Sequence, residues 1–225
     1  MAKVTAKRGP ARREEGLSRE RVIDAAIELL DAEGEDGLTF RALAARLATG
    51  PGAIYWHITN KNELLVAASD AVVARALASV SPNATPKKAI RSIAVNVFET
   101  FDAHPWIDAQ MARYPWPTAM MQIFERIGRQ IQALRVPRSA QFTAATVLVS
   151  YIIGESLQNA ANGRAYEPRP DRADFLDTLA AEWKKLDAQE YPFTRNVADQ
   201  LRDHDDRTEF LAGVDLILAG IVASL

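Results

Sequence analysis

Hydrophobic residues recur at helical spacing near the start of the chain. The pattern lies between Ser18, a candidate N-cap, and Gly34, a candidate helix stop. Its apolar members are three and four positions apart, and side chains with that spacing share one face of a helix. They are Val22, Ile23, Ala26, Ile27 and Leu30. The sequence therefore predicts a first helix that buries this face and ends at Gly34.

Three shorter patterns follow this helix. Thr39 is a candidate N-cap for a short helix, and Pro51 suits the first position of a very short helix that runs to about residue 58. Asn60 then caps a fourth helix, with Glu63 three residues later, as in a capping box. The N-terminal part of the chain is thus expected to form small helices joined by tight turns.

The rest of the chain also reads as helical. The segment 81–86 contains two prolines and marks a break, and 163–170 contains Gly and Pro residues that indicate a loop. No run alternates between apolar and polar residues as a half-buried strand does. The sequence therefore predicts an all-α protein with a small N-terminal unit and a larger C-terminal one. The helices expected after the break are 87–103, 105–113, 117–134, 138–162, 171–188, 194–202 and 206–224.

Composition narrows the class of protein. The 225 residues are 48% hydrophobic and 25% charged, which is typical of a soluble globular protein, and the absence of cysteine excludes disulfides and thiolate metal sites. The most apolar stretches, 142–154 and 211–225, are shorter than the ~20 residues that span a bilayer. The basic N-terminus lacks the apolar run of a signal peptide. We expect a cytoplasmic protein with no membrane partner.

The distribution of charge points to a polyanionic partner. Residues 1–16 are rich in Lys and Arg and are expected to form a flexible basic arm. The segment 37–61 contains Arg41, Arg46 and Lys61 but neither Asp nor Glu. An acid-free surface near a cationic arm suits a polyphosphate such as DNA. Charge alone leaves open that these side chains only decorate a solvated surface.

The order of the short helices favours DNA. A short helix, a tight turn and a second helix from Pro51 form a helix-turn-helix, whose second helix lies in the major groove. Tyr55 and His57 follow the first turn of that helix, with Trp56 between them. Polar-tipped aromatic side chains at this position can bind phosphate. For Tyr55, a place in the core with a satisfied hydroxyl is the alternative.

The run from Ser18 to Leu65 resembles the DNA-binding domain of the TetR family of bacterial transcriptional repressors. Its Tyr-Trp-His element is also similar to that of the tetracycline repressors. The resemblance implies a helix-turn-helix domain of three helices at 17–65, a connecting helix at 61–79, and a ligand-binding and dimerisation domain at 80–225. The matching motifs are Gly34, Gly37-Leu38-Thr39, Arg41, Leu43-Ala44, Leu47, Pro51-Gly52-Ala53-Ile54-Tyr55-Trp56-His57 and Asn60-Lys61-Asn62-Glu63-Leu64-Leu65.

The resemblance also implies DNA contacts by position. Phosphates would be bound by Thr39, Tyr55, His57 and Lys61, and Arg41 would reach a base edge, most commonly a guanine. The remaining residues of the expected DNA site, most of them facing the groove floor, are Thr49, Gly50, Pro51, Gly52, Ala53 and Trp56. The family more often has Ser or Thr at the position of Gly50, and this third helix offers no long polar side chain. Base reading is therefore expected to depend on Arg41 and on apolar contacts with thymine methyl groups.

The C-terminal half contains two helices, 141–157 and 210–224, that are apolar on almost every side and must be covered on every side. A second copy of the chain would cover the outer side, and the resemblance implies a homodimer held by a four-helix bundle of these helices. For Gly213 and Gly220, tight packing within one protomer is the alternative. The expected interface residues are Val149, Ile153, Leu157, Gly213, Leu216, Ile217 and Gly220.

A pocket for a small-molecule effector is also expected, most of all along the proline-broken segment 104–117. Aromatic and Met side chains with a few polar groups suit a hydrophobic or planar ligand, although any one of them can simply fill the core. The candidates are His104, Trp106, Met111, Tyr114, Trp116, Met120, Phe124, Phe142, Tyr151, Glu155 and Asn159, with Phe175 and Trp183 beyond them.

These features and the resemblance together predict a ligand-responsive transcriptional regulator. We expect it to be a repressor that binds a palindromic operator as a homodimer and is released by a small hydrophobic or aromatic effector. A DNA-binding dimer without ligand control, or a small-molecule-binding protein or enzyme, is the alternative. No phosphate-binding loop or nucleophile motif indicates an enzyme, and no cofactor is expected. The cluster 203–206 could hold a cation, but Asp205 or Asp206 more simply caps the last helix. A metal-chelate effector bound with His104, as in the tetracycline repressors, stays open.

Overall fold

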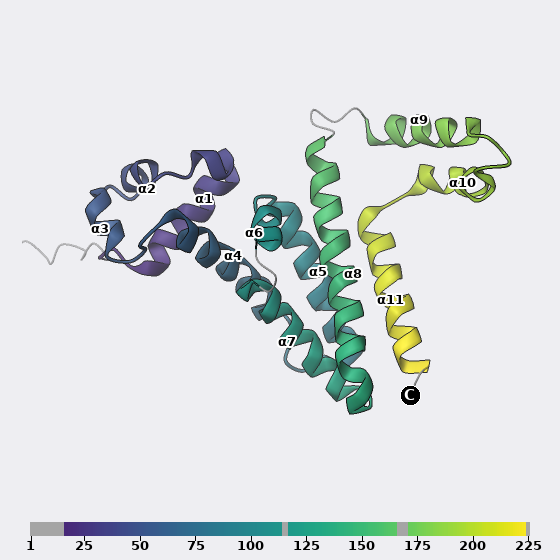
Figure 1. Ribbon diagram of the computed structural model, residues 1–225, viewed down its shortest axis with the longest axis horizontal. Helices are drawn as coiled ribbons and strands as arrows, with labels where there is room; N and C mark the ends of the chain where they lie inside the picture. The colour runs from purple at the N-terminus through teal and green to yellow at the C-terminus, as the bar shows by residue number, and fades with distance from the viewer. Residues whose placement is uncertain (1–15, 114–116, 166–170, 224–225) are drawn as a thin grey trace, which may run out of the picture. The chain divides into compact units, whose positions relative to one another are not determined.

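The computed structural model describes residues 16–113, 117–165 and 171–223 (Figure 1). Within these ranges every regular element is a helix and no strand occurs, so the predicted all-α fold class is confirmed. Apart from Gly16, the basic arm expected at 1–16 lies outside the described residues. None of the described helices is both long enough and apolar enough to span a membrane.

The chain folds into two compact units, Met1–Leu64 and Leu65–Leu225. In the first unit, helix α1 (Arg19–Gly37) begins where the sequence predicts, because the Ser18 hydroxyl accepts a hydrogen bond from the Arg21 amide at 3.2 Å. The whole predicted apolar face of α1 is buried. Gly34 interrupts the helix in the left-handed region (φ 69°), and the last turn follows this kink.

Helices α2 (Phe40–Arg46) and α3 (Pro51–Tyr55) form the helix-turn-helix. Helix α2 ends in a Schellman motif, in which the Thr49 amide donates to the Ala44 carbonyl and the Ala48 amide donates to the Ala45 carbonyl. The left-handed position of this motif is Ala48, with φ 50°, and the glycine at position 50 lies two residues further on. The chain therefore makes this left-handed turn with an alanine rather than with glycine, the residue that suits it best.

Helix α3 is shorter than predicted and ends at Tyr55 rather than near residue 58. The amides of His57 and Ile58 both donate to the carbonyl of Ile54, which closes the helix in a turn. Buried Ile54 and Ile58 then anchor this turn in the core of the unit. The residues between them are thereby presented at the surface.

Helix α4 (Lys61–Ala78) carries a modified capping box at its start. The Asn60 side chain accepts a hydrogen bond from the Glu63 amide at 2.8 Å, as predicted. The Glu63 carboxylate does not return to Asn60; it accepts hydrogen bonds from the hydroxyl and the amide of Thr59. These bonds hold the pKa of Glu63 below its usual value. The start of α4 is thus tied to the turn that follows α3.

The second unit is a bundle built around one long helix, α8, which extends three residues past the predicted end at 162. Helices α5, α7 and α11 pack against α8, and Figure 1 shows α11 running antiparallel beside it. The segment predicted as one helix at 194–202 is instead split between α10 and η1. The elements are α5 (Pro86–Ala103), α6 (Ile107–Arg113), α7 (Thr118–Ala133), α8 (Arg138–Ala165), α9 (Arg172–Lys185), α10 (Pro192–Val197), the 3-10 helix η1 (Ala198–Asp203) and α11 (Asp206–Ala223).

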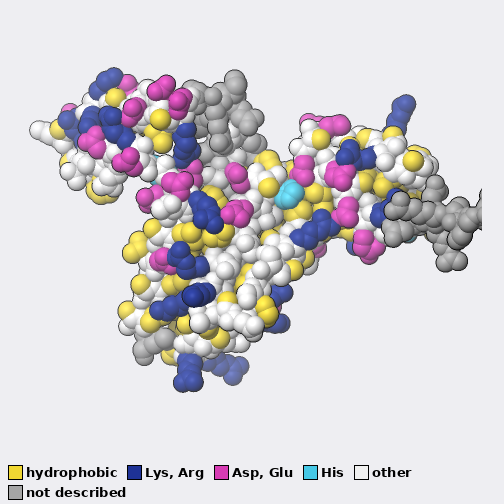
Figure 2. Space-filling model, turned by 180° about the vertical axis from the view of Figure 1, so that it is seen from behind, with side chains coloured by type: hydrophobic (Ala, Val, Ile, Leu, Met, Phe, Trp, Pro, Cys, Tyr) yellow, Lys and Arg dark blue, Asp and Glu magenta, His cyan; other side chains and the backbone are white. Residues whose placement is uncertain are grey.

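Two acids at the start of α11 take different roles. Asp205 is the N-cap, since its carboxylate accepts a hydrogen bond from the Thr208 amide at 2.8 Å, whereas Asp206 pairs with Arg172. Hydrogen bonds from the Thr208 hydroxyl and amide lower the pKa of Asp205. On the face shown in Figure 2, side chains of both charges are interspersed with hydrophobic ones. That mixture agrees with the net charge of −2.

The strained turn after α2 generates a stability prediction. Ala48→Gly removes the cost of a Cβ in the left-handed region, and this gain exceeds the extra freedom of the unfolded chain. We expect the free energy of unfolding to rise by about 1 kcal/mol, measured by urea denaturation with circular dichroism. Ala45→Gly, within the same helix, is the matched control and should lower it by about 1 kcal/mol. Equal effects of the two variants would contradict the assignment of strain to Ala48.

Candidate nucleic-acid interface and effector cavity

The surface of α2 and α3 presents an ordered tyrosine. The ring of Tyr55 stacks on the ring of Phe40, with centroids 4.4 Å apart and an angle of 5° between the planes. The side chain of Tyr55 is 52% exposed, so the alternative of a core aromatic is wrong. Because Phe40 opens α2, the stack joins the two helices of the motif and holds the phenol at the surface.

Trp56 is the most exposed large hydrophobic residue of the described part of the chain, at 89%. It follows α3 directly, beside Tyr55, while its other neighbour, His57, is half-buried. An indole left in water indicates a surface that is covered when a partner binds. Tyr55 and Trp56 therefore form an aromatic projection next to the helix that the motif would place in a groove.

The three cations of the acid-free segment 37–61 have different surroundings. Arg46 donates to Glu28 of α1 at 2.7 Å, and the amino group of Lys61 donates to the Glu35 carbonyl near the end of α1 at 2.6 Å. Arg41 is exposed and makes no hydrogen bond or ion pair with any residue that the structure describes. The acid-free stretch of sequence is thus not acid-free in space, and Arg41 is the cation left available for a base.

The remaining residues of the expected DNA site have short side chains. The Thr39 hydroxyl accepts a hydrogen bond from the Ala42 amide at 3.1 Å, which leaves its own proton free for a phosphate oxygen. Around the start of α3, open space surrounds both glycines, at positions 50 and 52. Pro51 is exposed, and Thr49 and Ala53 are half-buried. Nothing on this stretch reaches far from the backbone, as the sequence predicts.

Two adjoining cavities lie in the second unit, among the C-terminal part of α8, α9, η1 and the start of α11. Their volumes are about 400 Å³ and about 340 Å³. The larger is walled mainly by apolar side chains of α9, including Phe175 and Trp183. The smaller is lined mostly by polar and charged side chains, beside the aromatic residues Phe98, Tyr151 and Phe210. The residues that both cavities share are Gln158, Asn159, Asn162, His204 and Asp206.

The cavities contain some of the expected ligand residues and not others. Tyr151, Glu155, Asn159, Phe175 and Trp183 line them. The described part of the segment 104–117 lines neither, because Trp106 and Met111 are buried in the core and His104 stacks at a tilt on Trp106. Phe142 is exposed on α8 and contacts Phe124, and Met120 is half-buried. Tyr114 and Trp116 lie outside the described residues.

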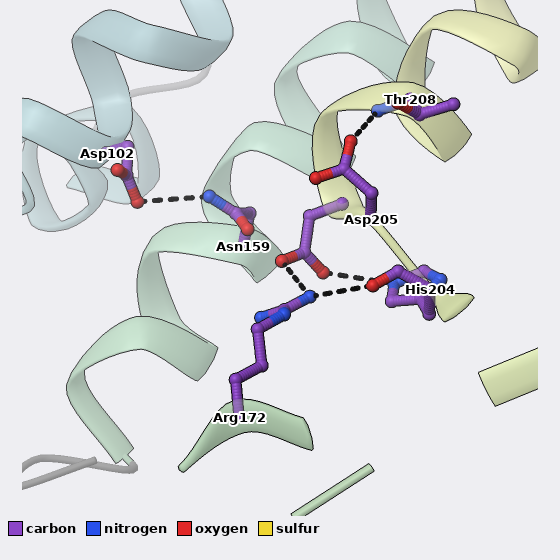
Figure 3. Close-up of polar contacts among 7 residues, drawn as sticks. Asp102, Asn159, Arg172, His204, Asp205 and Thr208 are labelled. Atoms are coloured by element: carbon purple, nitrogen blue, oxygen red, sulfur yellow. Dashed lines mark hydrogen bonds and ion pairs between the residues drawn. The ribbon is translucent and has the colours of Figure 1, made fainter. Parts of the chain in front are cut away.

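Sequence reasoning missed the residues that join α9 to α11. Arg172 at the start of α9 donates to Asp206 at 2.7 Å and to the His204 carbonyl at 3.4 Å, and the His204 ring lies 3.0 Å from Asp206 (Figure 3). Asn159 of α8 donates to Asp102 of α5 at 3.1 Å beside this group. The signal in the sequence was the cluster 203–206, which predicts a helix cap or a cation site but does not indicate the contact with α9. The described residues contain no group of three potential metal ligands.

The structure corrects the expected dimer surface. Val149 and Ile153 are 5% and 6% exposed, so they face the core of their own protomer. The space beside Gly213 is also filled within the protomer, because a Cβ there would lie 1.9 Å from the Tyr151 hydroxyl. Leu157 and Ile217 are half-buried, whereas Leu216 is 75% exposed and Gly220 is open. Periodicity does not identify the outer side of a helix that is apolar on every side.

A stripe of small and apolar residues marks the outer side of both helices. On α8 it is formed by Ala140, Thr143, Val147, Ser150 and Gly154, and on α11 by Ala212, Leu216, Ala219, Gly220 and Ala223. A groove of about 350 Å³ lies between the start of α8 and the end of α11, lined by Val136, Val147, Ile217 and Ile221 among others. We call the stripe residues on α8 and α11, without the rest of the groove lining, the outer stripe.

Two family models match the chain. Residues 22–68 match the model described as bacterial regulatory proteins of the tetR family, and residues 81–225 match the model described as a tetracyclin repressor-like C-terminal domain. The chain belongs to the TetR family. It is therefore a transcriptional regulator with a helix-turn-helix DNA-binding domain, and the family recognised from the sequence is confirmed.

Relatives support this membership. The TetR-family regulator SCO7222 of Streptomyces coelicolor is 53% identical, with a TM-score of 0.84 over 92% of this chain and 99% of that one. The HTH-type transcriptional repressor DrrR1 of Streptomyces coeruleorubidus is 26% identical over 222 residues, covering 91% of this chain and 77% of the relative. The class D tetracycline repressor of Escherichia coli is 51% identical over 59 residues, 26% of this chain and 27% of that protein. All three relatives are transcriptional regulators or repressors.

The contrast between the two arginines of α2 generates a prediction on base reading. Arg41→Ala should relax the preference for one base pair in each half-site, at a cost of about 1–3 kcal/mol, because it removes the guanidinium that we expect to contact a base edge. Selectivity is measured by competition between operator variants. Arg46→Ala is the matched control and should leave the preference unchanged, since Arg46 pairs with Glu28. Unchanged selectivity in Arg41→Ala would show that Arg41 does not read a base.

Proposed function

We propose that this TetR-family regulator is a repressor that binds a palindromic operator as a homodimer and is released by a small-molecule effector. The observation that carries the DNA part is the surface of α2 and α3, where Tyr55, Trp56 and Arg41 are exposed together. Phosphate contacts from Thr39, Tyr55, His57 and Lys61 would set the position on the duplex, and Arg41 would read a base. The repressor DrrR1 is similar over most of the chain and supports the sign of regulation.

The homodimer is proposed from the outer stripe. Leu216 and Val147 are 75% and 46% exposed in the protomer, and small residues beside them permit close approach of a second pair of helices. Packing two copies of α8 and α11 against each other would cover the stripe in a four-helix bundle. A two-fold dimer carries two helix-turn-helix motifs, and this symmetry matches a palindromic operator.

Ligand control is proposed from the two adjoining cavities. Each is within the usual range of small-molecule sites; the larger is lined by aromatic and apolar side chains with several polar groups, and the smaller mostly by polar and charged side chains beside three aromatic rings. An effector bound there would favour a dimer in which the distance between the two DNA-binding domains no longer matches the spacing of the operator half-sites. The alternative of a DNA-binding dimer without ligand control offers no role for these cavities.

The first test is operator binding by the purified protein to DNA from its own upstream region, over a series of salt concentrations. Affinity should fall with salt because phosphate contacts release counterions. Tyr55→Phe keeps the stack on Phe40 but removes the phenol proton, and should weaken operator binding about tenfold. Tyr191→Phe, an exposed tyrosine of the second unit, is the control and should not change the affinity. Equal binding to all DNA sequences would overturn the proposed function.

The proposed dimer has its own test. Leu216→Arg places a charge on the outer stripe without burying it in the protomer, because Leu216 is exposed there. Sedimentation velocity should show a dimer for the unchanged protein and a folded monomer for this variant. Met121→Arg, on an exposed position of α7, is the control and should stay dimeric. A Leu216→Arg protein that sediments as a dimer would place the interface elsewhere.

A further inference from the structure

The smaller cavity has an aromatic wall. The ring of Phe210 lies between Phe98, whose centroid is 4.7 Å away, and Tyr151, whose centroid is 5.8 Å away and whose plane is nearly parallel at 6°. The Tyr151 hydroxyl lies 3.3 Å from the Phe210 carbonyl and donates to it, so its proton is already engaged. Aromatic faces attract cations through their quadrupole. Because Phe210 and Phe98 are only 2% and 6% exposed, the wall offers a ligand the ring of Tyr151 but not its phenol proton.

Two carboxylates in this cavity are not compensated. Glu155 of α8 and Glu209 of α11 both line it, and within the described ranges neither carboxylate accepts a hydrogen bond or forms an ion pair. The third carboxylate, Asp206, is already paired with Arg172. Like charges that converge on a concave surface concentrate their field there and attract a counter-ion. The cavity therefore presents negative charge that the protein itself does not neutralise.

The titration of Tyr151 responds to the same field. Burial raises the pKa of Tyr151, and the nearby charges of Glu155 and Glu209 raise it further. Both glutamates therefore act on one point of the cavity wall, although they belong to different helices. A ligand group at that point would experience both charges.

The larger cavity is chemically different. Its walls include Phe175, Leu179, Trp183 and Leu201, and its guanidinium, Arg172, is held by Asp206 and the His204 carbonyl. Among the described residues that line this cavity, Arg172 is the one Lys or Arg side chain, and its charge is offset by Asp206. The two cavities are adjacent, since Asn159 and His204 are among the residues that line both. A single ligand can therefore extend from an apolar compartment into an acidic one.

We propose that the effector of this regulator is an organic cation with an aromatic body. Its ammonium group is held by Glu155 and Glu209 beside the ring of Tyr151, and its aromatic body lies beside Trp183. The inference rests on the proposed function, because it names the class of effector that the proposed ligand control would use. Acidic and neutral aromatic compounds are selected against, since neither satisfies the two carboxylates.

The test uses three probes of one shape and different charge: anthracenylmethylammonium, anthracenylmethanol and anthracenecarboxylate. Their binding to the full-length protein, without DNA, is measured by energy transfer from tryptophan to anthracene and by calorimetry. The ammonium probe should bind about tenfold more tightly than the alcohol, since partly exposed charge pairs contribute modest energies, and the carboxylate should bind most weakly. Salt should reduce the difference between the ammonium probe and the alcohol. Equal affinities for the ammonium probe and the alcohol would overturn the proposal.

Variants locate the cation. Glu155→Gln and Glu209→Gln keep the shape of the side chain and remove its charge, and the double variant should bind the ammonium probe and the alcohol with equal affinity. Glu125→Gln, on α7 and outside both cavities, is the matched control and should retain the selectivity. Thermal unfolding checks that each variant is folded. Unchanged selectivity in a folded double variant would show that these glutamates do not hold the cation.

Release of the operator, measured in parallel with the same probes, separates this inference from the proposed function. Selective binding of the ammonium probe without release of the operator would support the cation site and contradict the proposed release by ligand. Release by the carboxylate or the alcohol, without selectivity for the ammonium probe, would support ligand control and overturn the cation site.

Discussion

The second unit depends on how the sides of α8 are shared. Leu148 and Ile152 are buried in the core of the protomer, Val147 and Gly154 lie on the outer stripe, and Glu155 lines a cavity. One helix thus contributes to protomer stability, to the proposed dimer and to the proposed effector site. The three sides belong to one rigid helix. A change in the packing of α8 on one side therefore shifts the helix on the other two sides as well. This constraint would make α8 the physical connection between the proposed effector and the proposed dimer.

The start of α11, like α8, takes part in several different contacts. Asp205 caps the helix, Asp206 holds α9 through Arg172, and Glu209 lines the smaller cavity one turn later. Further along, Leu216 and Gly220 belong to the outer stripe. The proposed ammonium site would therefore bridge the two helices that carry the proposed dimer contacts, and its occupancy would act on their relative position. That is the kind of bistable contact through which a ligand can select one shape of a dimer.

In the first unit, short-range hydrogen bonds position the DNA-binding surface. The caps at Ser18, Thr39 and Asn60 are local and were predicted from residue type, because each involves an amide only three residues away. The pairing of Arg46 with Glu28, eighteen positions apart, was not predictable, since no local pattern records which helix faces lie together. The exposure of Trp56 follows from the same tertiary arrangement, in which Ile54 and Ile58 take the buried positions on either side.

The sequence by itself determined the helical class, nearly every helix start and the family, because caps, prolines and apolar spacing act over a few residues and the DNA-binding motif is contiguous. It did not determine the outer side of α8, where Val149 and Ile153 are buried and Val147 is exposed, because a helix that is apolar all round has no periodic signal to read. It also placed the pocket along 104–117, whereas the cavities lie among α8, α9 and α11. Only the tertiary structure decided these points, since a cavity is the space left between segments distant in the chain.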